Sequence, residues 1–505
     1  MRTNNSLRNA TVSFASQFVI ALTKYASRTI FLNIFTIELL GLSGLFQNII
    51  SVLAISELGF GFAITTILYK PIADNDIEKI KTLINFAKKV YYSVAFFIFL
   101  AGLLFIPFIN LIIKDSFIDI SQIRFYFLIF LLISVVSYFN SNKILLIIAD
   151  QKQYIEKKYL TLFTLLQTVI QIGVAIFTKN FALYLFVQLV VVIFQNIVIS
   201  NKVKTIYPWI NQKNISPLNN EYKHILKKNV AAMLFHKLGG VLILSSSNII
   251  ISAFIGLREV GLYSNYLLIV TTVAMIGSQF FDAVTASIGN YWVTENVNKT
   301  YFIFKVLALI NFWLYSFTSL CLIVLLQPFI ELWLGKEYLL PTITVFIMVS
   351  NYYFQGTRSM VNTFKNVKGL YWQDRYKPIF EMLVYIVFAL VLVNHFGLLG
   401  VLLGTTSSLL FVVLWVEPLV LYKHGFNKSP TEYYFAYFLV FIFTIAFSFI
   451  LYFVLLKLQN TIFNFLIRMV AVIFIPNILV WSVIKKTEEY KYLYQKIKEV
   501  LNAGR

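Results

Sequence analysis

Long apolar stretches, separated by short charged or turn-rich loops, make up nearly the whole chain. Most of them hold about 20 residues or more, the length that an α-helix needs to cross the hydrocarbon core of a bilayer. We therefore predict about fourteen membrane-spanning helices. Their approximate ranges are 12–36, 42–68, 90–113, 122–149, 159–178, 181–200, 229–255, 262–293, 301–327, 341–364, 378–395, 398–422, 435–456 and 461–484.

The composition agrees with this pattern. Hydrophobic residues make up 59% of the 505 residues, charged residues make up only 13%, and the mean hydropathy is +0.78. These values lie well outside the usage of soluble globular domains. Loops such as 178–180 and 394–397 are so short that the helices on either side must be antiparallel neighbours. The predicted fold class is therefore an all-α polytopic membrane protein.

The formal charge of +20 would suggest a nucleic-acid partner in a soluble protein. Here the charge follows alternate loops. Of the 42 lysines and arginines, 30 lie in the ends and loops of one side, six lie in the opposite loops and six lie within spans. This positive-inside asymmetry places both termini in the cytoplasm and accounts for the basic charge without nucleic acid.

The longest connection on the cytoplasmic side is residues 201–228, which follow the sixth predicted span. This segment is either an interfacial linker between two helix bundles or an ordinary solvated loop. A weak internal repeat favours two bundles: Gly41, opening the second span, and Gly261, opening the eighth, lie in similar segments 220 residues apart. The predicted divisions are an N-terminal lobe 1–200, the linker 201–228, a C-terminal lobe 229–422, two further helices in 423–484 and a cytoplasmic tail 485–505.

Six cations fall within predicted spans and more than five residues from the span ends, where an unpaired charge is costly: Lys24, Arg28, Lys143, Lys237, Arg358 and Arg468. Lys143 and Arg468 lie close enough to a boundary for their side chains to reach the interface or to bond locally. Lys143 has Asn140 and Asn142 beside it for such bonds.

Lys24 is the most deeply placed of these cations. It lies about a dozen residues, roughly 18 Å of helix, from each end of its span, beyond the reach of a snorkelling side chain. Arg28 follows four residues later and lies on the same helix face. The two cations either serve a ligand or form a structural ion pair with Glu57, at comparable depth in the next span. One carboxylate neutralises only one cation, so one positive charge remains for a ligand.

The second half holds a comparable set of charges. Lys237 and Asp282 lie at similar depth in antiparallel spans, so they could pair, or Asp282 could carry a proton. The sequence leaves two roles for Arg358: contact with a ligand, or hydrogen bonding in the protein interior. Glu381 and Glu417 lie near inner span ends and are expected at the membrane interface.

Enzyme, cofactor and metal motifs are lacking. Asp74 and Asp76 form a D-x-D pattern, but capping of the next helix explains it better than metal binding. A Walker A pattern is missing, and the outer loops are too short for a sizeable external catalytic segment. Neither the single Cys321 nor the four scattered histidines provide metal-ligand spacing. Gly400 and Gly404 form a G-x-x-x-G suited to close helix contact.

Four stretches resemble bacterial polysaccharide repeat-unit flippases of the Wzx type: residues 36–49, 56–61, 68–76 and 245–266. These flippases belong to the multidrug/oligosaccharidyl-lipid/polysaccharide exporter (MOP) superfamily. The resemblance implies two six-helix lobes around a central cavity, two additional C-terminal helices and alternating access. It also implies a bacterial cytoplasmic membrane as the location.

The resemblance implies an undecaprenyl-diphosphate-linked oligosaccharide as cargo, moved from the inner to the outer leaflet, with polysaccharide polymerase machinery as a candidate partner. The pyrophosphate needs cations, which we assign to Lys24, Arg28, Lys237 and Arg358.

Glu57 and Asp282 are the candidate groups for coupling to H⁺ or Na⁺. Two alternatives remain: a multidrug or cation antiporter of the same architecture, which would need a more acidic cavity, and a membrane-bound glycan-assembly enzyme.

Overall fold

The computed structural model describes residues 2–57, 59–114, 117–212, 226, 230, 239–243 and 245–503. All regular secondary structure in these residues is helical. Ten of the helices are long and apolar enough to cross a membrane. The chain is thus an all-α multi-pass membrane protein, as the hydropathy pattern predicts.

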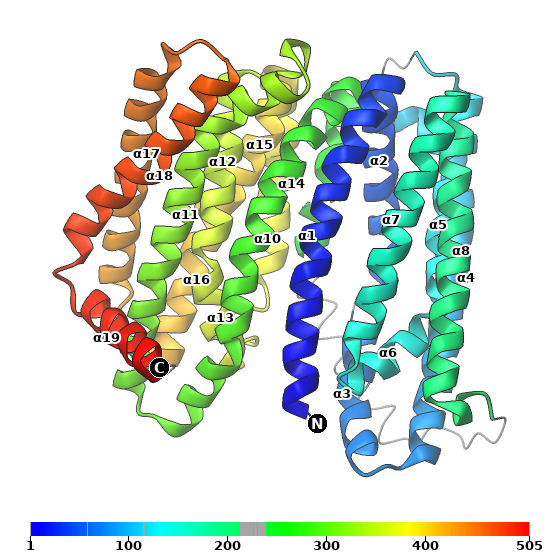
Figure 1. Cartoon of the computed structure of the whole chain (residues 1–505), viewed down its shortest axis with the longest axis horizontal. Helices are drawn as coiled ribbons and strands as arrows, with labels where there is room; N and C mark the ends of the chain where they lie inside the picture. The colour runs from blue at the N-terminus through cyan, green and yellow to red at the C-terminus, as the bar shows by residue number, and fades with distance from the viewer. Residues whose placement is uncertain are drawn as a thin grey trace. The chain divides into compact units, whose positions relative to one another are not determined.

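The chain forms two compact units, Met1–Gly261 and Leu262–Arg505. Figure 1 shows the helices of the first unit in blue to green. They are α1 (Arg2–Ile34), α2 (Ile37–Leu53), η1 (Ala54–Glu57), α3 (Phe60–Ala73), α4 (Ile77–Phe105), η2 (Ile106–Ile112), α5 (Ile120–Tyr138), α6 (Ser141–Ala149), α7 (Gln153–Thr178), α8 (Phe181–Ile206), η3 (Pro208–Asn211), the helix Gly239–Phe254 and the start of α10 (Leu257–Thr294).

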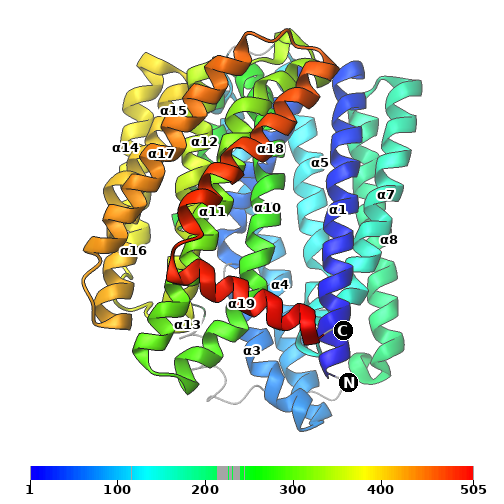
Figure 2. The same ribbon diagram turned by 60° about the vertical axis from the view of Figure 1, so that its left-hand side comes forward.

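The second unit continues α10 and carries the C-terminal helices (Figures 1 and 2). These are α11 (Val297–Trp333), η4 (Lys336–Tyr338), α12 (Thr342–Thr357), α13 (Ser359–Val367), α14 (Lys377–Phe396), α15 (Leu398–Ser408), η5 (Leu409–Val413), α16 (Leu414–Val420), η6 (Leu421–Phe426), α17 (Thr431–Leu456), α18 (Ile462–Ile484) and α19 (Glu488–Ala503). The predicted lobe boundary in 201–228 lies mostly outside the described residues and stays a prediction.

Three spans that the sequence predicts as continuous helices are interrupted. The range 42–68 contains the end of α2, the 3₁₀ turn η1 and the start of α3. Gly59, which immediately precedes α3, has a φ of 97°. The range 122–149 divides into α5 and α6 at Asn140, and the range 341–364 divides into α12 and α13 at Arg358. Hydropathy detects apolar length but not a backbone break, so the expectation of unbroken helices is wrong at these three places. The first break matters for the site, because it carries Glu57.

The G-x-x-x-G pattern makes the close helix contact that the sequence predicts. A methyl group on Gly400 would overlap the backbone of Leu392, and one on Gly404 would press on Ala389. Both glycines therefore let the backbones of α14 and α15 touch across the short turn at Gly397. This helical hairpin fixes the position of α14, which carries two residues of the ion cluster described below.

The two glycines of the internal repeat meet each other in the structure. A methyl group on Gly41 of α2 would overlap the carbonyl oxygen of Leu257, and one on Gly261 of α10 would overlap the carbonyl oxygen of Ile37. Ile37 and Leu257 are themselves 220 residues apart, as the two glycines are. The contact is therefore reciprocal, as expected when two copies of one motif cross about a local two-fold axis. This geometry supports the duplication.

Alanine at either glycine of this crossing should destabilise the protein, because the added methyl pushes two helix backbones apart. We expect Gly41→Ala and Gly261→Ala each to lower the free energy of unfolding by about 1–3 kcal/mol. The double variant should lose less than the sum, because both methyls open the same crossing. Thermal unfolding of purified protein measures these losses.

Gly173→Ala is the matched control, because Gly173 lies within α7 with nothing within 4 Å of an added methyl. Alanine there should leave stability unchanged or raise it by about 0.5–1 kcal/mol. Equal behaviour of all three variants would contradict the reciprocal crossing.

Candidate functional site

One face of α1 carries the two mid-span cations and two phenylalanines. Lys24, Arg28, Phe31 and Phe35 follow one another at intervals of four, three and four residues, so they lie on one helix face. Phe31 and Phe35 are 6% and 7% exposed, Arg28 is partly exposed, and Lys24 is exposed. The face therefore passes from a closed aromatic end to an open basic middle.

The aromatic end is held by α8. The ring of Phe31 lies 6.0 Å from that of Phe181 and 5.6 Å from that of Tyr184, and Phe35 makes the same two contacts at 5.6 Å. Edge-to-face aromatic packing of this kind adds to ordinary area burial. The packing fixes the rotation of α1 and with it the direction in which Lys24 points.

Lys24 points away from the most exposed apolar face of its helix. Leu22, which is 56% exposed, lies nearly opposite Lys24, since two residues turn a helix by about 200°. Phe18, which is 61% exposed, lies about 120° around the helix from Lys24. The predicted span 12–36 lies mostly within α1, and apolar side chains so exposed in a membrane-spanning helix are expected to face lipid. Lys24 is therefore accessible on the face that turns inward at Phe31.

Lys24 and Arg28 differ in their surroundings. Arg28 lies close to the hydroxyl-bearing rings of Tyr25 and Tyr184. Lys24, in contrast, makes no hydrogen bond or ion pair within the described part of the chain. Of the two predicted anion-binding cations, Lys24 is thus the more available one.

Glu57, the predicted counter-charge, lies in η1 and accepts a hydrogen bond from the hydroxyl of Tyr138. Tyr91 also lies near its carboxylate. Both tyrosines come from helices other than α1, namely α5 and α4. Pairing of Glu57 with Lys24 or Arg28 stays a prediction.

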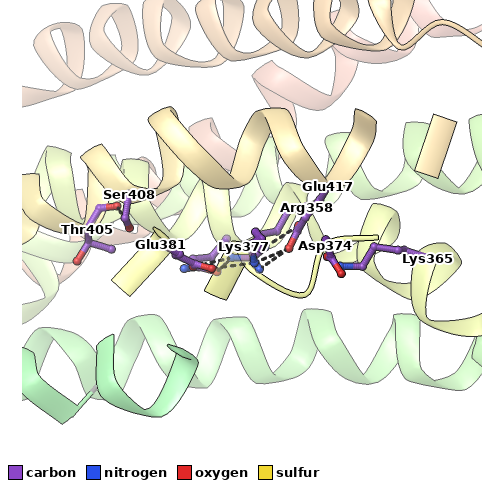
Figure 3. A network of polar contacts seen from close by, with 9 residues as sticks. Arg358, Lys365, Asp374, Lys377, Glu381, Thr405, Ser408 and Glu417 are labelled. Carbon is purple, nitrogen blue, oxygen red and sulfur yellow. Dashed lines mark hydrogen bonds and ion pairs between the residues drawn. The ribbon is translucent and has the colours of Figure 1, made fainter. Parts of the chain in front are cut away.

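A buried ion cluster occupies the second unit (Figure 3). Arg358, between α12 and α13, donates from Nε and Nη2 to the two oxygens of Glu417 at 3.1 and 2.8 Å. Its Nη1 reaches Glu381 at 3.4 Å. Lys377 contacts Glu381 and Glu417, both at 2.7 Å. Two cations thus balance two carboxylates.

All four carboxylate oxygens of the cluster have a protein nitrogen as a partner. Gln355 adds its side-chain oxygen, 3.1 Å from the guanidinium of Arg358. A buried ion pair is tolerated only when geometry and hydrogen bonds are this complete. Lys365 and Asp374 form a second buried ion pair beside the cluster (Figure 3).

The cluster locates three residues that the sequence singles out. Glu381 and Glu417, expected at the membrane interface, are 7% and 1% exposed, so they lie inside the protein rather than in solvent, and their depth in the membrane stays a prediction. Arg358 lies in the interior among carboxylates, and its contact with cargo stays a prediction. Span boundaries give the depth of a residue along a helix but not the neighbour it faces, so the sequence could not reveal these pairs.

Two other span cations also have protein partners. Lys143 donates to Asn140 Oδ1 at 3.2 Å and to the hydroxyl of Ser200, in agreement with the expected local bonding. Arg468, 4% exposed, donates to Asn460 at 3.0 Å and to the carbonyl of Leu458 at 2.7 Å. These bonds account for both charges within the protein.

The remaining predicted residues are placed as follows. Asp282 is exposed on α10, about a dozen residues from its C-terminal end, and lies near Tyr315 of α11. Lys237 lies outside the described residues. Asp76 caps α4 by accepting from the backbone N–H of Lys79 at 3.1 Å, which confirms the capping interpretation of the D-x-D pattern.

An apolar groove of about 600 Å³ lies in the second unit and was not predicted from the sequence. Its walls come from α11, α17 and α18, three helices of membrane-spanning length. Apolar and aromatic side chains dominate its lining, among them Phe312, Leu320, Leu439 and Phe443. Lys305 and Glu489 line it at the end where α11 begins and α18 ends.

No protein-family model and no curated protein matches the chain. Solved structures do match. The lipid II flippase MurJ, in an inward closed conformation, is 14% identical with a TM-score of 0.66, over 97% of this chain and 99% of the flippase. An inward-facing multidrug resistance MATE family transporter of the MOP superfamily is 15% identical with a TM-score of 0.61, over 81% of this chain and 98% of the transporter.

A MOP superfamily transporter from Pyrococcus furiosus, described as having a binding pocket of reverse polarity, is 13% identical with a TM-score of 0.56, over 85% of this chain and 97% of that one. Together these likenesses show that the chain has the fold of MOP superfamily transporters. The match to the flippase leaves only about 15 residues of this chain uncovered, fewer than α17 or α18 contains. The match therefore reaches into both α17 and α18.

Removing one carboxylate from the ion cluster should destabilise the protein strongly, because buried cations then lose their partner. We expect Glu417→Gln to lower the free energy of unfolding by about 3–5 kcal/mol. Arg358→Gln combined with Glu417→Gln should cost less than the sum of the single changes. Thermal or denaturant unfolding of purified protein measures this.

Glu295→Gln provides the control, because its partner Lys299 is 65% exposed and lies 3.0 Å away. An exposed pair of this kind contributes less than about 1 kcal/mol. If Glu417→Gln costs no more than Glu295→Gln, the cluster does not stabilise the fold.

Proposed function

We propose that the protein is a flippase that moves undecaprenyl-diphosphate-linked oligosaccharide repeat units from the inner to the outer leaflet of the bacterial cytoplasmic membrane for surface polysaccharide export. It works by alternating access, with both termini in the cytoplasm. The observation that carries this proposal is Lys24, an exposed cation in the middle of the predicted span 12–36, on the same face of α1 as the buried Phe31.

The charge of Lys24 supports an anionic cargo. A mid-membrane cation is costly unless an anion or water meets it, and a lipid pyrophosphate supplies strong acceptor oxygens. Arg28, one helical turn away, adds a second positive group. Lys237 and Arg358 remain candidate contacts in the same proposal. Lys143 and Arg468 have protein partners and need no ligand.

The groove supports a lipid cargo. A polyprenyl chain needs a continuous apolar surface open to the bilayer, and the walls of the groove are membrane-spanning helices lined by apolar side chains. Its volume of about 600 Å³ accommodates a section of hydrocarbon chain. A water-soluble cation does not require an apolar groove of this kind for binding.

A cation antiporter needs accessible carboxylates, and Glu381 and Glu417 are neutralised by protein cations. The exposed Asp282 is the carboxylate that we propose for coupling to H⁺ or Na⁺, with Glu57 as a second candidate. Both lie in helical segments that are expected to move during alternating access.

Neutralising Lys24 should abolish transport without loss of folded protein, because Lys24 contacts cargo rather than another residue. In proteoliposomes, Lys24→Gln should lower the rate of lipid-linked oligosaccharide flipping by roughly tenfold or more. Lys24→Arg should retain much of the rate, because it keeps the charge. Arg28→Gln should also lower the rate. Flipping is measured as access of an external sugar-modifying reagent to labelled lipid.

Lys336→Gln is the control, because it removes an 84% exposed cation that lies outside the spans. It should transport at the normal rate. Normal flipping by Lys24→Gln, or extrusion of cationic dyes by protein that does not flip lipid, would contradict the proposal.

A further inference from the structure

Lys305 stands where an apolar groove meets a polar surface. It lies two turns into α11 and lines the groove together with Glu489, the second residue of α19. The Nζ atom of Lys305 lies 2.9 Å from Glu489 Oε1, and the two side chains are 40% and 19% exposed. The cation at the end of the groove is thus held by the C-terminal helix.

The end of the groove carries balanced charge while α19 is docked. Lys428 lies over the ring of Tyr301 at 5.0 Å, and Lys305 lies 5.9 Å from the same ring. Glu432 and Glu489 line the groove here as well. If Glu489 moves away from Lys305, this end of the groove gains one net positive charge. The charge then lies directly beside the apolar lining of the groove.

The C-terminal helix α19 crosses α11 rather than running along it (Figure 2). Besides the ion pair, the ring of Tyr492 packs edge-on against Phe302 at 5.4 Å, and Trp481 Nε1 donates to the hydroxyl of Tyr490 at 3.0 Å. These two contacts involve no charge, so they keep α19 attached when the ion pair is broken.

We propose that Lys305 binds the phosphate of a membrane lipid whose tail lies in the groove between α11, α17 and α18. When no such lipid is bound, Glu489 forms an ion pair with Lys305. The occupant is an anionic lipid because the groove walls are membrane-spanning helices, the lining is apolar, and the cation lies at one end. A carboxylate and a phosphate offer Lys305 the same kind of charge-assisted bond.

The ionised carboxylate of Glu489 is a partner of Lys305 that an anionic ligand can replace. Burial alone would raise the pKa of Glu489, but the hydrogen bond and charge of Lys305 outweigh burial and hold the pKa below its ordinary value. Glu489 is therefore ionised at neutral pH and competes with an anionic ligand. A phosphate with more than one charged oxygen competes well for the same ammonium.

This inference rests on the proposed function, because the groove is where we place the cargo lipid. It deepens that proposal by naming a second phosphate-binding residue besides Lys24, at the end of the groove, and the C-terminal helix that controls this residue. Binding to the groove can be measured without transport, so the two proposals fail separately. A protein that binds anionic lipid through Lys305 but flips no oligosaccharide would contradict the flippase proposal alone.

Native mass spectrometry of the full-length protein with dioleoyl phosphatidic acid tests the inference, with dioleoyl phosphatidylcholine as the zwitterionic lipid of identical tails. Lys305→Gln should weaken phosphatidic acid binding by roughly tenfold and leave phosphatidylcholine unaffected. Lys305→Arg should retain binding. Glu489→Gln should strengthen phosphatidic acid binding, because the competing carboxylate is gone.

Lys299→Gln and Glu295→Gln are the matched controls, since they break an ion pair of 3.0 Å near the same end of α11 without touching the groove lining. Both should bind like the unmodified protein. Ala436→Trp, which fills the groove from an exposed position of α17, should weaken binding of both lipids. The inference is overturned if Lys305→Gln behaves like Lys299→Gln, or if Ala436→Trp binds phosphatidic acid normally.

Discussion

An unpaired charge in the membrane interior costs several kcal/mol, and this cost organises the structure. The chain meets it in two ways. Arg358 and Lys377 are neutralised by Glu381 and Glu417, so the second unit carries a closed, charge-balanced cluster. Lys24 instead remains exposed on the face of α1 that carries the buried Phe31. A closed cluster stabilises the fold, whereas an accessible cation requires an anion or water. This difference separates structural from functional charge more reliably than depth in the membrane does.

The proposed cargo combines the two chemical surfaces that the chain offers. Lys24 and Arg28 provide positive charge in one unit, and α11, α17 and α18 provide an apolar groove in the other. Each surface suits one part of a lipid with an anionic headgroup: cations suit the headgroup, and an apolar groove suits the hydrocarbon chain. The fold of MOP superfamily transporters includes drug and lipid transporters among its solved structures, so fold alone leaves the cargo open. The site chemistry, not the fold, favours a lipid-linked anion.

Much of the fold was predictable because apolar length alone marks a membrane-spanning helix, and the close contact of Gly400 was signalled by its G-x-x-x-G pattern. Gly41 was recognised only as part of an internal repeat, and its contact with α10 came from the structure. The break before Gly59 was not predictable, because hydropathy is insensitive to backbone direction. The mid-span cations were located from the sequence, but the partners of Arg358 were not, because they depend on helix rotation. The groove was missed for a related reason: a gap between packed helices depends on which faces meet.

A structure of the protein bound to an undecaprenyl-diphosphate-linked sugar tests the central claim most directly. The account predicts a pyrophosphate oxygen within about 3 Å of Lys24 Nζ, with the ion pairs of Arg358 and Glu417 retained. A pyrophosphate bound elsewhere, with Lys24 paired to a protein carboxylate, would contradict it.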